Sequence, residues 1–281
     1  MIEQKIQELI DAGALFVINH SGGKDSQAMY HVVKSRVPAR QILVIHANLG
    51  EVEWDGVISH IKATIDDHPL LVCKNENKTF LEMVEKRGMF PSPQQRQCTS
   101  DLKRGPIERE IRRYLKAHPE FEGRIVNCMG LRAQESANRA KQKVFKANEG
   151  NSIAGREWYD WLPIHHYTID QVWKVIEDAG QTPHPAYARG MSRLSCRFCI
   201  MASDEDLRTA ARLSPDLYQK YVDMEQAIGR TMMMPRGGVA KSLEEITGIA
   251  AGRPAKPAAA MPTVASAPQA ELDFDMPAPA M

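Results

Sequence analysis

A short glycine-rich loop near the start of the chain has the residue types of a phosphate-binding site. Its members are Ser21, Gly22, Gly23, Lys24, Asp25 and Ser26. An apolar run over residues 14–18 precedes it, and residues 27–33 follow with apolar side chains at helical spacing. A glycine-rich turn that opens a helix directs several backbone N–H groups at one point, where the helix dipole adds positive potential. The serines can donate hydroxyl groups, and Asp25 can hold a hydrated Mg²⁺ ion, so we predict a phosphate site here.

A second group of charged residues follows the apolar run at residues 124–129. Arg132 and Arg139 flank Glu135 in this segment. The planar fork of arginine suits phosphate or sulfate oxygens. Glu135 either holds an arginine in position or accepts a hydrogen bond from a substrate. Structural ion pairing would explain the same charges, so the spacing alone leaves both interpretations open.

The elements that must position these residues alternate between strand and helix patterns. Strands are predicted at residues 14–18, 41–46, 70–73, 124–130 and 158–164, and helices at 2–12, 54–65, 79–86, 106–115 and 168–176. This order predicts an α/β fold with a doubly wound, mostly parallel sheet. Ligands bind outside the carboxyl ends of such strands, which places His46 and Asn48 beside the phosphate loop unless residues 46–51 are a plain connection.

Three motifs together resemble a known family. The loop resembles the SGGKDS loop of the adenine nucleotide alpha-hydrolases, or N-type ATP pyrophosphatases. The block that runs from Cys98 through Lys103 to Pro106 resembles the C-T-x-x-L-K-x-x-P block of the phosphoadenosine phosphosulfate (PAPS) reductase family. Residues 130–139 are similar to its G-x-R-x-x-E-S-x-x-R segment. The resemblance covers roughly residues 14–203 and implies a Rossmann-like fold that binds an adenine nucleotide.

The resemblance implies roles for individual residues. The loop would hold ATP and the departing pyrophosphate, and the strand end at His46 and Asn48 would contact adenine together with Gly130. Where the family more often has Thr-Gly, this chain has Asn48-Leu49-Gly50, so the role of that strand end is less closely specified. The expected catalytic residues are Lys24, Asp25 and Arg132. The expected substrate-binding residues are Lys103, Arg132, Glu135 and Arg139.

Four of the five cysteines are candidate metal ligands. Cys196 and Cys199 form a Cys-x-x-Cys pair, which suits zinc, an iron–sulfur cluster such as [4Fe-4S], or a redox dithiol. The resemblance adds Cys98, because related proteins bring these distant blocks together near the nucleotide. Cys128, at the carboxyl end of a predicted strand, is the candidate fourth ligand, and His184 or an exogenous ligand are alternatives.

Two enzymatic functions and one binding function fit these motifs. The first is an ATP-dependent enzyme that cleaves the α–β bond, forms an adenylate and releases pyrophosphate, as in sulfurtransferases that modify nucleic acids, including DNA phosphorothioation enzymes. Its acceptor would be a small molecule or a nucleic acid, with a sulfur-donor protein as a further partner. The second is a PAPS or adenylylsulfate reductase. Reductases of this family typically carry a modified phosphate loop and a cysteine close to the C-terminus, whereas this chain keeps Lys24-Asp25 and has no cysteine after Cys199. The third is a non-catalytic nucleotide-binding module recruited through its tail.

Composition sets the wider limits. The 281 residues carry a formal net charge of +1, so a nucleic-acid contact needs a local basic patch. No signal-peptide pattern or membrane-spanning run is found, which predicts a cytoplasmic protein with reduced thiols. We expect a domain over residues 1–203, a helical extension over 204–249, and an Ala/Pro-rich disordered tail over 250–281. Within the tail, the island Gln269–Phe274 resembles the peptides that dock bacterial sliding clamps.

Overall fold

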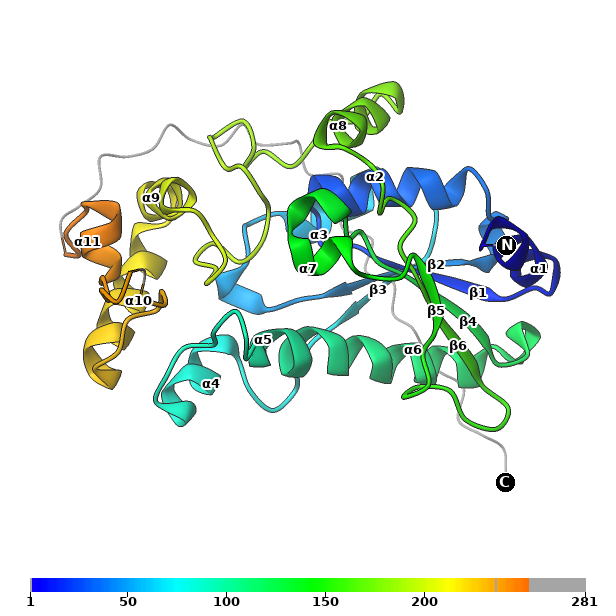
Figure 1. The fold of residues 1–281 in the computed structure, drawn as a ribbon, viewed down its shortest axis with the longest axis horizontal. Coiled ribbons are helices and arrows are strands. Elements are labelled where there is room, and N and C mark those ends of the chain that lie inside the picture. Colours follow the sequence, from blue (N-terminus) through cyan, green and yellow to red (C-terminus); the bar gives the residue numbers. More distant parts are fainter. Residues whose placement is uncertain (1, 236, 253–281) are drawn as a thin grey trace.

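The computed structural model describes residues 2–235 and 237–252, which fold around one sheet (Figure 1). Its strands are β1 Leu15–Asn19, β2 Ile42–Ala47, β3 Leu70–Cys73, β4 Arg124–Cys128, β5 Phe145–Ala147 and β6 Glu157–Trp161. The order across the sheet is β3-β2-β1-β4-β6-β5, and every neighbouring pair is parallel except β5 with β6. The predicted α/β class with a doubly wound, mostly parallel sheet is therefore confirmed. The chain changes direction across the sheet between β1 and β4, so the loop after β1 lies at the switch point where such sheets bind ligands.

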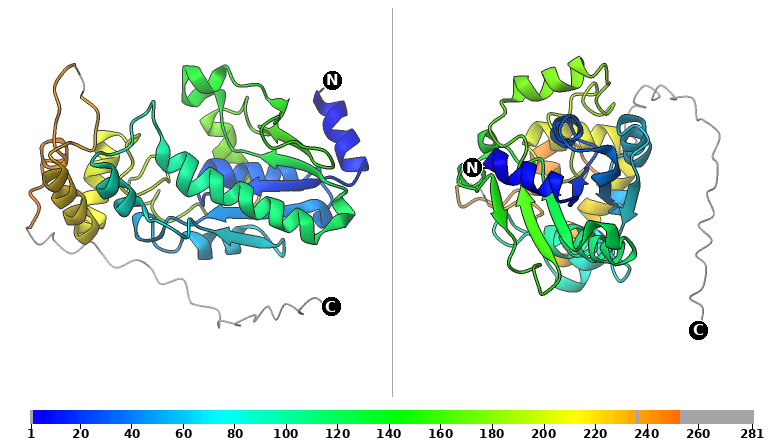
Figure 2. Two further views of the ribbon diagram at one scale, coloured as in Figure 1. Left: turned by 90° about the horizontal axis from the view of Figure 1, so that it is seen from below. Right: turned by 90° about the vertical axis from the view of Figure 1, so that its right-hand side faces the viewer.

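Helices cover both faces of the sheet. They are α1 Ile2–Asp11, α2 Lys24–Lys34, α3 Val57–Thr64, α4 Phe80–Arg87, α5 Gln97–Thr99, α6 Gly105–Ala117, α7 Ala137–Ala140, α8 Ile169–Asp178, α9 Asp204–Leu213, α10 Pro215–Ile228 and α11 Leu243–Thr247. Alternate residues of β1 point to opposite sides: Phe16 and Ile18 join the core under α1, α2 and α8, whereas Leu15 and Val17 join the core under α6. Helix α6 lies along its own face of the sheet (Figures 1 and 2).

Local signals account for most element boundaries. Thr168 caps α8 in a reciprocal capping box with Gln171, and Pro106 occupies the first turn of α6, where its missing N–H costs nothing. Ser214 separates α9 from α10, and Pro215 occupies the first turn of α10. Strand β5 was not predicted, because three residues are too few to display a two-residue period.

The last three helices gather at one end of the molecule (Figure 1). Tyr221 of α10 stacks on Phe80 and Phe90, with ring centroids 5.9 and 6.0 Å apart, and lies 5.0 Å from the ring of Phe198. These helices therefore share a core with the sheet domain. The boundaries at 203/204 and 249/250 stay predictions, and the island Gln269–Phe274 lies outside the described residues. No helix in residues 2–235 and 237–252 is long and apolar enough to cross a membrane.

Candidate functional site

The phosphate loop is closed by its own hydroxyl groups. Ser26 Oγ accepts a hydrogen bond from the backbone N–H of Ser21 at 3.1 Å and donates to the Gly23 carbonyl at 2.8 Å. Gly22 has φ +76°, and a Cβ there would lie 2.9 Å from Val57 Cγ1, so glycine is required on both counts. The N-cap residue of α2 is Gly23, which has no side chain to cap the helix. The first-turn N–H groups of this helix therefore suit an anionic ligand.

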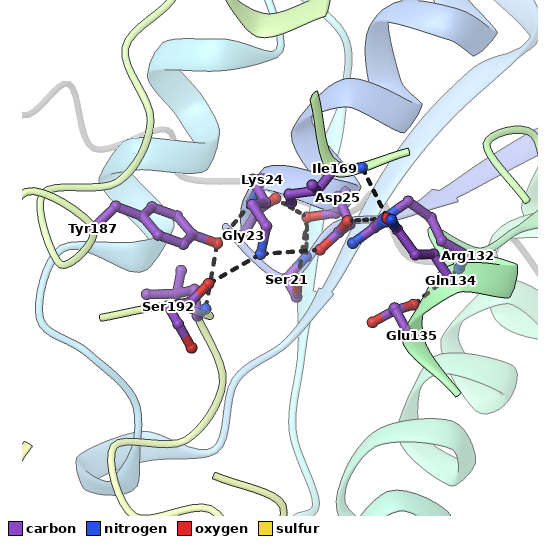
Figure 3. Close-up of polar contacts among 12 residues, drawn as sticks. Ser21, Gly23, Lys24, Asp25, Arg132, Gln134, Glu135, Ile169, Tyr187 and Ser192 are labelled. Carbon is purple, nitrogen blue, oxygen red and sulfur yellow. Dashed lines mark hydrogen bonds and ion pairs between the residues drawn. The ribbon is translucent and has the colours of Figure 1, made fainter. Parts of the chain in front are cut away.

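Asp25 lies between two cations (Figure 3). Its Oδ1 accepts a hydrogen bond from Arg132 Nε at 2.6 Å, and its Oδ2 lies 3.6 Å from Lys24 Nζ. Arg132 lies in the segment that follows β4. Its side chain is 6% exposed and also donates a hydrogen bond to Gln134 at 2.9 Å. Gly130 makes this approach possible, because a Cβ there would lie 3.1 Å from the Asp25 carbonyl oxygen. The structure thus brings together Lys24, Asp25 and Arg132, the three residues predicted to be catalytic.

A segment distant in sequence covers the other side of the loop. The Tyr187 hydroxyl accepts hydrogen bonds from the backbone N–H of Lys24 at 2.9 Å and of Leu194 at 3.3 Å. Lys24 Nζ donates to the Ser192 carbonyl at 3.2 Å and lies over the ring of Tyr187, 5.3 Å from its centroid. Buried Asp206 holds Ser192 by accepting from its N–H and its hydroxyl, each at 2.7 Å. Lys24 is therefore tied to this covering segment in addition to Asp25.

Sequence reasoning assigned no role to Tyr187, Ser192 or Asp206. Tyr187 lies in the stretch His184–Cys199 that was singled out only for its cysteines. Tyr187 lies between Ala186 and Ala188, and nothing in these neighbours indicates a partner more than 160 residues away.

The arginine-rich segment after β4 contains its own ion pairs. Glu135 accepts a hydrogen bond from the backbone N–H of Arg132 at 2.9 Å and forms an ion pair with Arg139. Glu135 therefore holds the backbone of Arg132 in place, in agreement with the first of the two roles considered for it. Ser136 caps the short helix α7 by accepting from the N–H of Arg139. Arg132 and Arg139 thus belong to one short turn, which the carboxylate of Glu135 holds in place.

His46 and Asn48 are already engaged at the end of β2. His46 is buried, with Nδ1 2.9 Å from the His20 carbonyl oxygen and Nε2 3.2 Å from Glu53. Asn48 accepts a hydrogen bond from the N–H of Gly50 at 2.7 Å and so shapes the following turn. Both residues hold backbone segments next to the phosphate loop in place, and their contact with adenine stays a prediction.

His20 supports the loop from beneath. Its Nδ1 accepts a hydrogen bond from the N–H of Gly22 at 3.1 Å, which requires the neutral ring. Burial, together with the nearby His60, His46 and His31, lowers the pKa of His20 to about 3. The imidazole is therefore uncharged at neutral pH, and the loop hydrogen bond depends on that state.

Three cysteines meet at a separate cluster that also includes Lys103. Burial raises the pKa of the Cys196 thiol to about 12, with Cys199, Glu53 and Cys98 adding to the rise while Lys103 opposes it. Burial and the neighbouring Cys199 likewise raise the pKa of Cys98. Burial by itself would lower the pKa of Lys103, but the sulfur of Cys196 and the other acidic groups around it raise it. The predicted meeting of Cys98 with the Cys-x-x-Cys pair is thus found.

Lys103 belongs to this cysteine cluster and separates from the other predicted substrate residues. It lies in a π-helical turn, Ser100–Arg104, between α5 and α6, a type of turn that is frequent at functional sites. Glu53, which was not predicted, joins the two regions: its carboxylate lies 3.2 Å from His46, and its backbone carbonyl accepts from Arg197 at 2.6 Å.

The predicted fourth metal ligands have other partners. Cys128 is fully buried in β4, where its thiol donates to the Val126 carbonyl, and it is not among the groups whose charge acts on Cys98 or Cys196. His184 has Nε2 3.2 Å from the Asp55 carbonyl oxygen and accepts from the N–H of Ala186 at Nδ1. Within residues 2–235 and 237–252 no three His, Cys, Asp or Glu side chains are arranged to hold a metal ion. The cysteine cluster is therefore not a preformed four-ligand site.

The family model of the phosphoadenosine phosphosulfate reductase domain matches residues 16–202. An uncharacterized 37.8 kDa protein of Escherichia phage 186 is 28% identical over 159 residues, which make up 57% of this chain and 46% of that protein. An uncharacterized protein of Methanocaldococcus jannaschii is 21% identical over 227 residues, or 81% of this chain and 45% of that protein. The chain thus spans about half the length of the curated relatives it matches.

Two solved structures resemble the chain at low identity. The PAPS reductase of Candida auris, in complex with phosphate, aligns at 13% identity and a TM-score of 0.43 over 64% of this chain and 80% of that one. The FMN adenylyltransferase of Candida glabrata, in complex with FMN and an ATP analog, aligns at 14% identity and a TM-score of 0.40 over 66% of this chain and 54% of that one. The family match rests on sequence and spans the loop, Arg132 and the Cys-x-x-Cys pair. Since it covers more than half of the chain, the protein belongs to the phosphoadenosine phosphosulfate reductase domain family.

Proposed function

We propose that the protein binds Mg²⁺-ATP on residues 21–26, cleaves it between the α- and β-phosphates and passes the adenylyl group to an acceptor. The observation that carries this proposal is the intact loop at the switch point of the sheet, with Gly23 at the N-cap of α2 and with Arg132 held beside Asp25. A triphosphate needs N–H donors, hydroxyl donors and cations around one point, and this loop offers all three. The donor set therefore fits the nucleotide.

Each loop residue has a distinct task in this reaction. The first-turn N–H groups of α2 and the hydroxyl of Ser21 would bind the pyrophosphate portion, and Asp25 would hold a hydrated Mg²⁺ ion. Arg132 would stabilise the charge that develops on the phosphates as the bond to pyrophosphate breaks. Mg²⁺ supplies further neutralisation of that charge when it is bound. Catalysis would rest on charge stabilisation and in-line positioning.

The main alternative, sulfate reduction, needs a thiolate that attacks sulfur. The family match favours this alternative in general terms, but residues 21–26 keep the ATP form of the loop where the reductases typically have a modified one, and the Cys196 thiol is not activated. Burial raises the pKa of the Cys196 thiol to about 12, so the thiol form dominates at neutral pH. A nucleophilic cysteine ordinarily has a lowered pKa. Sulfite production from PAPS with thioredoxin as reductant would establish the reductase and displace the adenylyl-transfer proposal.

A metal or iron–sulfur cluster at Cys98, Cys196 and Cys199 is a separate proposal, because no step of the ATP reaction depends on it. The three thiols are close enough to affect one another's pKa, but no three His, Cys, Asp or Glu side chains of the described residues are arranged to hold a metal ion. Iron, sulfide and zinc analysis of anaerobically purified protein tests the proposal. Loss of any bound metal in Cys196→Ser would assign it to this cluster.

The experiment for the proposed function is a pyrophosphate-release assay with Mg²⁺-ATP across small-molecule and nucleic-acid acceptors. We expect pyrophosphate from the intact chain and at least a 100-fold lower rate for Asp25→Asn and Lys24→Ala. Asp178→Asn is the matched control, because Asp178 is an exposed carboxylate of α8 that pairs only with Lys174 in the described part of the chain. Release of inorganic phosphate, or nucleotide binding without turnover on any acceptor, would contradict the proposal; the second result would identify a non-catalytic nucleotide-binding module.

A further inference from the structure

A pocket of about 590 Å³ lies between α6 and the turn that precedes β6. Five cationic side chains line it: Arg109, Arg112, Arg113, Lys116 and Arg156. The four on α6 are spaced at i, i+3, i+4 and i+7, so they form one stripe on a single helix face. The remaining lining residues are Leu115, Gly123, Ile153, Ala154 and Gly155. A lining with five positive charges and no acidic residue stands out in a chain whose formal net charge is +1.

Nearby carboxylates balance only part of this charge. Arg109 pairs with Glu76 at 3.1 Å and with Glu110 at 2.7 Å, and Arg113 pairs with the same Glu110 at 2.8 Å. Among the described residues, no acidic side chain pairs with Arg112, Lys116 or Arg156. The pocket therefore keeps a net positive charge.

Asn151, an uncharged residue, holds two of the unpaired arginines in place, one through its side chain and one through its backbone. Buried Asn151 accepts a hydrogen bond from Arg112 at its side-chain oxygen, 3.1 Å away, and from Arg156 at its backbone carbonyl, 2.8 Å away. A carboxylate at this position would position the same two guanidinium groups and also neutralise one of them. The amide positions them without reducing their charge. This arrangement is what an anion-binding site requires.

The pocket is not part of the nucleotide site. Gly123 and Arg156 come immediately before β4 and β6, so the pocket lies at the amino ends of these parallel strands. The phosphate loop follows the carboxyl end of β1, at the opposite edge of the sheet. Helix α6 runs along one face of the sheet between the two regions, with its first turn next to the cysteine block (Figures 1 and 2). A ligand in the pocket is therefore independent of the reaction proposed above.

We propose that this pocket and the basic stripe of α6 bind the phosphodiester backbone of a nucleic-acid duplex. The stripe from residue 109 to residue 116 is about 10 Å long, which is enough to contact successive phosphates of one strand. None of the lining residues is aromatic, so the stacking that single-stranded nucleic acids use is not provided here. The apolar side of α6, including Ile111, is buried against the sheet, so the helix cannot insert into a membrane surface. Backbone charge is what remains to be recognised.

Binding of a fluorescent 20-base-pair DNA duplex to the full chain, measured by anisotropy at several salt concentrations, tests the proposal. The logarithm of the association constant is expected to fall with the logarithm of salt concentration. The slope should lie between about −2.7, if the three unpaired cations contact phosphates, and about −4.5, if all five do. The single strand of the same sequence should bind more weakly. ATP and inorganic phosphate at millimolar concentration should not displace the duplex.

Variants locate the binding surface. Replacing Arg112, Lys116 and Arg156 together by Gln should remove about 2.7 from the slope and weaken binding roughly 100-fold or more at 0.1 M salt. Lys62→Gln is the matched control, because Lys62 is an exposed lysine of α3 on the other side of the sheet. This variant should bind the duplex as the original chain does. Asn151→Asp is the sharpest change, since it keeps every cation but adds one negative charge beside Arg112, and it should reduce the slope by about 1.

Several results would overturn the proposal. No duplex binding, a triple variant that binds like the original chain, or an equal loss in Lys62→Gln would each refute it, as would binding to anionic vesicles in place of the duplex. If the triple variant fails to fold, lysine modification of the original chain decides the matter. The duplex must then protect Lys116 and leave Lys62 reactive.

Discussion

The pair formed by Asp25 and Arg132 allows a quantitative test of how the loop is held. Two changes remove its members: Asp25→Ala deletes the carboxylate, and Arg132→Met deletes the guanidinium while keeping the apolar stem. A hydrogen bond to a charged group contributes about 1.5–3 kcal/mol, and the Nε–Oδ1 distance here is 2.6 Å. The Asp25 side chain is 23% exposed, so solvent screens part of the interaction. We therefore expect a coupling free energy of about 2 kcal/mol.

The two single changes should differ in size. Asp25→Ala leaves Arg132, which is 6% exposed, without a carboxylate, and an unpaired buried charge is costly. Arg132→Met leaves Asp25 next to Lys24, whose Nζ is 3.6 Å away, and partly in water. We expect a loss in the free energy of unfolding of about 3 kcal/mol for Asp25→Ala and about 2 kcal/mol for Arg132→Met.

Equilibrium urea unfolding of both single variants and the double variant, followed by tryptophan fluorescence, measures the coupling. The pair of Lys174 and Asp178 on α8 serves as the control, because its side chains are 70% and 59% exposed at an N–O distance of 2.8 Å. That exposed pair should show a coupling below about 0.5 kcal/mol. If the effects of Asp25→Ala and Arg132→Met add to within about 0.5 kcal/mol, the guanidinium does not hold Asp25 and the reasoning about the loop is refuted.

Two further predictions concern the loop and its support. Gly130→Ala should weaken ATP binding at least tenfold, because the new Cβ would lie 3.1 Å from the Asp25 carbonyl oxygen and 3.3 Å from the Ser26 nitrogen. Gly150→Ala is the control: the nearest atom to its Cβ is 3.7 Å away, so this variant should bind ATP like the original chain in calorimetry. Equal binding by both variants would contradict the close packing of Gly130 on the loop. Burial lowers the pKa of His20 to about 3, so as the pH falls this residue takes up a proton in the unfolded chain before it does so in the folded one. Its contribution to the free energy of unfolding is full above pH 6.5 and should fall by up to about 1.4 kcal/mol per pH unit between pH 6.5 and 3. His20→Asn, which can still accept from the Gly22 N–H, should lose that part of the slope in urea titrations at several pH values; an unchanged slope would show that His20 is not the titrating group.

Motifs and periodicity were sufficient to predict the fold class and the place of the glycine-rich loop in the sheet. The phosphate loop is a run of six adjacent residues, and its glycines and serines act within that run, so their arrangement could be predicted locally. Strand and helix patterns then placed the loop at the carboxyl edge of a parallel sheet, which the structure confirms. Strand β5 escaped prediction because three residues display no period, and its pairing with β6 depends on the longer strand already being present.

Tertiary structure decided which distant residues meet. The Asp25–Arg132 pair joins residues 107 positions apart, and the Tyr187 hydroxyl reaches Lys24 across 163 positions. Lys103 looked like a partner of the arginines near the loop, but the π-helical turn before α6 directs it to the cysteines. Such contacts depend on how helices pack on the sheet, and no local spacing records that packing.

The loop and the basic stripe of α6 illustrate the same division. The sequence by itself determined that a glycine-rich loop opens a helix and that the cations of residues 109–116 recur at helical spacing, because both follow from neighbours within two helical turns. Only the folded chain brings Arg156 and Asn151 up to that stripe, and only it ties Lys24 to Ser192. The reason is physical: local geometry is set by the backbone within a few residues, whereas the partners of a charge are set by which surfaces bury apolar area against each other.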